Sequence, residues 1–211
     1  MALVDDTRIV LLGLRVTGSA DSDRLLASVR AMGNDVEVPT LLGRLETAGL
    51  VEQRRDRWRL TVEGRVEGER LLQLELDAAG ARGGIATAYE RFLNLNGPLL
   101  RVCTDWQLRD ADPSSLIVND HTDELFDRDV LARLAQIHSL VVVVCDELTR
   151  HLDRFRNYAV RLSAAHDGVV GGETAGLDGP TADSYHGVWF ELHENLIATL
   201  GLDRANEPLP D

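Results

Sequence analysis

Lysine is absent from this 211-residue chain, so all 22 of its basic residues are arginines. Cysteine is nearly absent as well, because Cys103 and Cys145 are the two in the chain. They lie far apart, in apolar segments and without the spacing of a metal site. Isolated thiols of this kind indicate buried free cysteines in a reducing compartment rather than a disulfide framework.

Long apolar runs are also missing. The most apolar stretch, Leu140 to Cys145, is far too short to span a bilayer. The N-terminus lacks the basic region and apolar run of a signal peptide. We therefore expect a soluble cytoplasmic protein that does not bind membranes.

No catalytic motif is present. The chain has no Gly-x-Ser-x-Gly, no zinc-type Cys/His cluster and no dinucleotide fingerprint. The glycine-rich segment from Gly168 to Gly179 lacks the Gly-Lys-Ser/Thr ending of a phosphate loop, so we interpret it as a surface loop. We predict that the protein is not an enzyme and that it needs no cofactor. The sequence leaves open whether the helical second half binds a metal.

Acidic residues outnumber basic ones, giving a net charge of −13, but they are unevenly distributed. Residues 1–75 contain 11 arginines and 13 acids, a net charge of −2. Residues 76–211 contain 11 arginines and 22 acids, a net charge of −11. A nearly neutral first half with clustered arginines can still contact phosphates, whereas a uniformly acidic one could not.

The stretch from Leu41 to Gly64 carries the most informative pattern. It begins with an apolar stripe at helical spacing, and Gly49 can close that helix in the left-handed conformation. Extended runs follow, in which Trp58 and Leu60 alternate with arginines at strand period. Thr-x-x-Gly then leads into another helix, so the stretch predicts a helix, a basic hairpin and a further helix. The stripe consists of Leu41, Leu42, Leu45 and Ala48.

This order resembles the winged-helix domains of the MarR and PadR families of bacterial transcriptional regulators. The resemblance covers about residues 8–75 and implies a mainly α protein with an N-terminal winged helix-turn-helix, 1–76, that carries a small β-hairpin. In these families the third helix enters the major groove and the wing lies beside the backbone or in the minor groove. The DNA-binding residues it implies are Thr40 and Arg44 on the helix and Arg54, Arg55, Arg57 and Arg59 on the wing.

We therefore expect a regulator that binds double-stranded DNA as a homodimer, because one short recognition helix rarely gives enough affinity. The alternative is an accessory protein that uses the same fold for protein contacts, with the arginines forming a solvated hairpin. Unpaired arginines would favour DNA. Arginines paired with Glu52, Asp56 or acids of the second half would favour the alternative.

The second half is predicted to be an all-helical bundle for dimerisation and small-molecule sensing, because strand alternation is almost absent. A small-residue linker, 77–84, would lead into a bundle domain, 85–205, and a tail, 206–211.

Within the bundle, Asn96-Gly97-Pro98 is expected to kink or split the first helix. Asp110 to Asp120, which includes Pro113, is expected to form a loop, and the last helix to run from Thr181 to Leu200. Four arginines could bind an acidic small molecule or pair with the surplus acids of this domain, and such pairing across helix faces is the usual explanation. They are Arg150, Arg154, Arg156 and Arg161.

Histidines and tryptophans of the bundle are candidates for an effector site. His186 and His193 share one face of the last helix, and His138 shares a stripe with apolar residues. The alternative, which we favour, is that these histidines are core or interfacial residues, because a metal site needs matched ligands and supporting partners. The candidates are His138, His186, His193, Trp106 and Trp189.

Overall fold

The computed structural model describes residues 2–112, 115–179, 181 and 183–202. Within these ranges the chain is mainly helical, with eight α-helices, two short 3-10 helices and two antiparallel hairpins of two strands each. No helix in the described ranges is both long and apolar enough to cross a membrane. The predicted tail, 206–211, lies outside them.

The first half contains four helices and one hairpin. Side-chain caps fix where two of the helices begin, since Asp21 accepts the N–H of Arg24 at 2.8 Å and Thr61 accepts the N–H of Gly64 at 2.9 Å. Each cap satisfies a backbone donor that has no partner within its helix. In chain order the elements are α1 (Ala2–Thr17), α2 (Ser22–Ala31), α3 (Val38–Thr47), β1 (Val51–Arg54), β2 (Arg57–Leu60) and α4 (Val62–Ala78).

The second half contains the longer helices and the second hairpin. Asp123 caps its longest helix by accepting two backbone N–H groups, both at 3.1 Å. In chain order the elements are α5 (Arg82–Gln107), β3 (Leu108–Asp112), β4 (Ser115–Val118), α6 (Glu124–His151), η1 (Asp153–Phe155), α7 (Arg156–Val170), η2 (Thr174–Gly176) and α8 (Tyr185–Leu200).

The first hairpin is extended by one residue from elsewhere in the chain. Val51 lies opposite Leu60, and Arg55 and Asp56 form the turn with φ angles of 48° and 64°. Positive φ at both positions matches the right-handed twist of a tight hairpin. On the free edge of β2, Ala20 and Trp58 exchange backbone hydrogen bonds of 3.0 and 2.7 Å. The hairpin is thereby fixed to the segment between α1 and α2.

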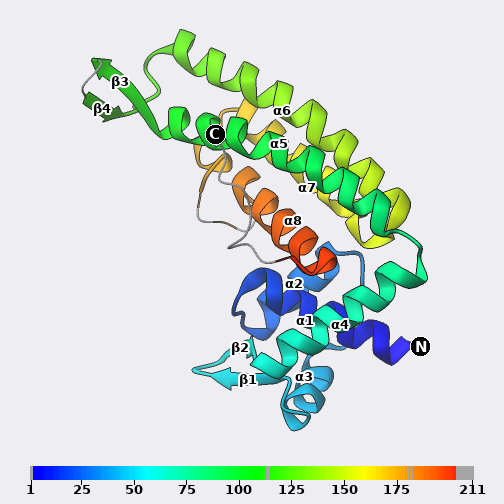
Figure 1. Ribbon diagram of the computed structural model, residues 1–211. Coiled ribbons are helices and arrows are strands. Elements are labelled where there is room, and N and C mark those ends of the chain that lie inside the picture. The colour runs from blue at the N-terminus through cyan, green and yellow to red at the C-terminus, as the bar shows by residue number, and fades with distance from the viewer. Residues whose placement is uncertain (1, 113–114, 180, 182, 203–211) are drawn as a thin grey trace.

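The buried apolar side chains form two clusters that interlock. One lies among α1 to α4 and the first hairpin, and the other among α5 to α8. Ala198 of α8 nevertheless belongs to the first cluster, and Leu76 of α4 belongs to the second. Figure 1 shows α8 between the two groups of helices, where it contacts α1 and α4 as well as α5 and α7.

The prediction of a loop over Asp110 to Asp120 is wrong for most of that stretch. The strands β3 and β4 pair there, with Leu108 opposite Val118. The N–H of Asn119 continues the pairing to the carbonyl of Gln107 at 2.8 Å. Backbone hydrogen bonds hold these short strands, so they need no alternation of apolar side chains. Pro113 lies outside the described residues.

Three further predictions can be compared with the structure. Helix α5 is not split at Pro98, and Phe92 before it and Leu99 after it are buried in the same cluster. Only residues 79–81 separate α4 from α5, whereas the predicted linker was longer. Helix α8 begins after Thr181, at the point where Ser184 accepts the N–H of Gly187 at 3.1 Å.

Candidate functional site

Helix α3 presents Thr40 and Arg44 on its exposed face, while the three leucines of its opposite face are buried. The hydroxyl of Thr40 donates to the carboxylate of Glu37 at 3.1 Å. No described residue forms a hydrogen bond or ion pair with the guanidinium of Arg44. Arg44 is therefore the basic side chain of this face that is free to bind an anion.

Two of the four hairpin arginines share one carboxylate. Arg59 donates to Glu52 at 2.6 Å, and the Nε atom of Arg54 lies 3.4 Å from the same group. The hydrogen bond from Arg59, supported by the charge of Arg54, lowers the pKa of Glu52 below its usual value. Glu52 thus stays ionised at neutral pH and neutralises part of the basic hairpin.

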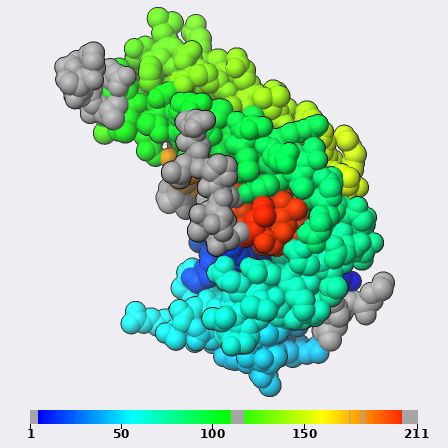
Figure 2. Space-filling view, viewed as in Figure 1, coloured from blue at the N-terminus to red at the C-terminus, as the bar shows by residue number. Residues whose placement is uncertain are grey.

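The other two hairpin arginines differ from each other. Arg57 donates to the hydroxyl of Ser19 at 3.1 Å and also to its backbone carbonyl, so it fastens the hairpin to the segment that carries Ala20. Arg55 is exposed in the turn, and its side chain pairs with nothing in the described ranges. Figure 2 shows the hairpin projecting from the same end of the molecule as α3.

Thr61 holds the end of α3, the hairpin and the start of α4 together. Its hydroxyl donates to the carbonyl of Gly49 at 2.7 Å and accepts the N–H of Gly64 at 2.9 Å. Its own N–H donates to the carbonyl of Leu50 at 3.1 Å. The Thr-x-x-Gly pattern therefore fixes the angle between α3 and α4.

Two of the predicted effector residues on α8, Trp189 and His193, lie against Phe92 of α5. Trp189 stacks on Phe92 with ring centroids 4.6 Å apart and donates its indole N–H to Asn96 at 2.8 Å. His193 is buried, with its ring centroid 5.4 Å from that of Phe92. These contacts are those of residues packed in the core.

The remaining effector candidates lie elsewhere. His138 stacks on His166 with ring centroids 4.4 Å apart, and burial lowers its pKa. Trp106 lies against His121, and His186 lies 2.8 Å from a carboxylate oxygen of Asp178. The five candidate side chains therefore do not line one common binding site.

No protein-family model, no curated protein and no solved structure matches this chain. The geometry of its own residues is what supports a function.

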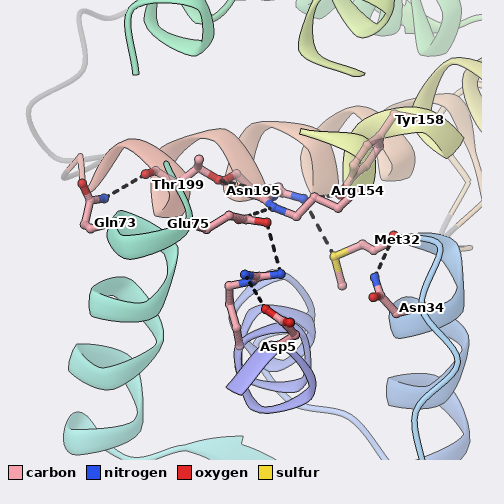
Figure 3. Close-up of polar contacts among 10 residues, drawn as sticks. Asp5, Met32, Asn34, Gln73, Glu75, Arg154, Tyr158, Asn195 and Thr199 are labelled. Atoms are coloured by element: carbon pink, nitrogen blue, oxygen red, sulfur yellow. Dashed lines mark hydrogen bonds and ion pairs between the residues drawn. The ribbon is translucent and has the colours of Figure 1, made fainter. Parts of the chain in front are cut away.

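A buried arginine joins the two halves of the molecule (Figure 3). Arg154 of η1 donates to Glu75 of α4 at 2.9 Å and to Thr199 of α8 at 2.6 Å. It also donates to Asn195, which in turn donates to the hydroxyl of Tyr158 at 3.0 Å. This network connects α4, η1, α7 and α8, so displacement of one element would disturb the others.

The predicted pairing with acids of the second half is confirmed for two of the four arginines, since Arg156 lies 2.7 Å from Asp153 and Arg161 lies 2.6 Å from Glu191. Arg154 instead pairs with Glu75 of the first half. The excess of acids over arginines in the second half predicted ion pairs, but it could not indicate that Arg154 would be buried at the junction of the two halves.

Proposed function

We propose that this protein is a DNA-binding transcriptional regulator of the winged-helix type that acts as a homodimer. The observation that carries the proposal is the order of its first elements. A helix, an isolated β-bridge residue at Ala20, two further helices and a hairpin paired to Ala20 through Trp58 follow one another. This order is expected of a helix-turn-helix with a wing, and it agrees with the resemblance to the MarR and PadR families.

The contacts proposed for DNA divide into two groups. Arg44 on α3 and Arg55 at the hairpin tip are exposed and unpaired within the described part of the chain, so they are free to bind phosphates or guanine. Thr40, Arg54, Arg57 and Arg59 have protein partners and would reach DNA only by exchanging them.

Dimerisation is proposed because α3 has 10 residues and can contact only a short stretch of groove. The bundle of α5 to α8 would supply the dimer contacts and sense a small molecule. An effector would act by binding one bundle arrangement more tightly than another. The Arg154 network offers a physical connection between that bundle and α4.

A protein-interaction function is the second candidate, and one observation favours it. Glu52 pairs with both Arg54 and Arg59, which leaves the hairpin less basic than the sequence indicates. In that case α3 and the hairpin would dock on a protein partner instead of phosphates.

The deciding experiment is fluorescence anisotropy of the full chain on the DNA upstream of its own gene, at about 50 and 200 mM salt. We expect binding that weakens steeply with salt. The Arg44→Ala, Arg55→Ala double variant should lower the slope of log affinity against log salt by about two. The matched control is Arg128→Ala with Arg150→Ala, which removes two exposed arginines from α6 and should leave the slope unchanged.

Absence of binding at low salt, or equal effects of the two double variants, would contradict the DNA proposal and favour a protein partner. Light scattering during gel filtration tests the dimer separately. A monomer at the concentrations that bind DNA would contradict that part of the proposal.

A further inference from the structure

Three side chains with metal-ligating atoms converge at one end of the bundle. They are Cys103 of α5, Asp178 in the segment before α8, and His186 in the first turn of α8. One ligand atom from each lies within 4.8 Å of the others. In the described part of the chain, this is the one group of three or more His, Cys, Asp and Glu side chains that converges in this way.

The surrounding contacts hold the three residues in place. The backbone N–H of His186 donates to the carbonyl of Leu177 at 2.9 Å, and the Leu177 side chain is buried in the core. Gln107, one turn after Cys103 on α5, donates to the Oδ2 atom of Asp178. This leaves the Oδ1 atom facing the Nδ1 atom of His186 at 2.8 Å. Such partners orient the ligands of metal sites.

The three side chains differ in exposure. Cys103 is buried, whereas the side chains of Asp178 and His186 are 22% and 37% exposed. The carboxylate and the imidazole therefore contact solvent, and the sulfur is enclosed by protein. The second cysteine, Cys145, is also buried but has no converging histidine and carboxylate among the described residues.

We propose that Cys103, Asp178 and His186 bind a divalent transition-metal ion of the Zn²⁺ type. Thiolate, imidazole and carboxylate are the ligands that Zn²⁺ takes in proteins, and softer sulfur ligation disfavours Mg²⁺ and Ca²⁺. Three protein ligands leave a fourth tetrahedral position for water or a small anion. The bound ion joins α5 to α8 and to the segment before it. This site does not depend on the proposed binding of DNA.

The test is a titration of the chelator-treated full chain with Co²⁺, which replaces Zn²⁺ and has visible absorption. We expect one Co²⁺ per chain, with a sulfur-to-cobalt charge-transfer band and the strong d–d bands of tetrahedral geometry. Cys103→Ser and His186→Asn should each abolish the charge-transfer band or weaken affinity by more than about 100-fold, and Gln107→Ala should weaken it by about 10- to 100-fold. Cys145→Ser is the matched control and should bind as the unaltered chain does.

Zn²⁺ should compete with Co²⁺ and raise the melting temperature of the unaltered chain but not of His186→Asn. His186 is partly exposed, so that variant tests the site even if Cys103→Ser does not fold. Lack of a charge-transfer band at saturating Co²⁺ would overturn the proposal. So would a band that Cys145→Ser removes, or one that His186→Asn retains at full affinity.

Discussion

A Cβ atom on Gly64 would lie 1.7 Å from the carbonyl oxygen of Leu50, so helix α4 begins in direct backbone contact with the residue that precedes β1. No side chain fits at that position without moving backbone. Together with the hydrogen bonds of Thr61, this contact fixes how α3, the hairpin and α4 meet. Glycine at position 64 is therefore required by packing.

Replacement of Gly64 by alanine should lower the free energy of unfolding by about 3 kcal/mol or more, because the backbone of Leu50 must shift. The measurement is urea denaturation followed by circular dichroism. The control is Gly43→Ala in α3, where an added Cβ meets nothing within 4 Å. That change should raise stability by about 1 kcal/mol, since alanine favours the helix. Similar effects of the two substitutions would refute the packing argument.

Removal of the Arg154 side chain should destabilise the protein by about 1–3 kcal/mol, because Asn195 and Thr199 lose a buried donor and Glu75 keeps Arg8 as its remaining ion-pair partner. Chemical denaturation of Arg154→Ala measures this loss. Arg70→Ala provides the comparison, since Arg70 forms an exposed pair with Glu67 one turn away. Its denaturation midpoint should barely change. Equal free energies of unfolding for Arg154→Ala and Arg70→Ala would show that the Arg154 network does not stabilise the junction of the two halves.

Stability should fall as the pH rises above about 9. Burial raises the pKa of both Cys103 and Cys145 to about 12, with smaller contributions from nearby Asp178 and Asp146. An unfolded thiol ionises near pH 8.5, so between that pH and 12 the unfolded chain has lost protons that the folded chain keeps. The native state is then disfavoured by up to about 1.4 kcal/mol per pH unit for each thiol.

Denaturation of the unaltered chain and of Cys145→Ala between pH 8 and about 11, both treated with chelator because Cys103 is a proposed metal ligand, tests this fall in stability. The variant should lose stability more slowly with pH, because one buried thiol is gone. Burial also raises the pKa of Tyr185, and Cys145 adds to that rise, so its removal weakens the pH dependence through both groups. Parallel curves would show that Cys145 does not titrate with a raised pKa.

Glu52→Gln should strengthen DNA binding if the proposed function is correct. The substitution frees Arg54 and Arg59 from a carboxylate and adds one net positive charge to the hairpin. The affinity should rise severalfold at low salt, and the salt slope should steepen by about one. Anisotropy titrations of Glu90→Gln, which makes the same charge change on α5, control for overall charge. Equal affinities of the two variants would count against hairpin contacts with DNA.

Local patterns predicted much of the helical structure. Helix α3 lies where the leucine stripe of residues 41–48 indicates it, and the hairpin lies where Trp58 and Leu60 alternate with arginines. In both cases neighbouring residues in the chain supply the information. The β3–β4 hairpin was missed because backbone pairing, and not side-chain alternation, specifies it.

Contacts between distant residues could not be predicted. The partners of Arg154 come from α4 and α8, and nothing within η1 identifies them. Cys103 and His186 lie far apart in the chain, so their spacing gave no sign that α5 and α8 would bring them together. The pairing of Glu52 with Arg59 is local, and the sequence left it open as one of two alternatives that the strand register decides.

The position of α8 has a consequence for how the protein folds as it is synthesised. Most multidomain chains complete their N-terminal core while later residues are still being translated. Here Ala198 packs into the core of α1 to α4, and α8 contacts both α1 and α4. The first core therefore keeps an uncovered apolar surface until α8 leaves the ribosome, and both halves are completed by the same late helix.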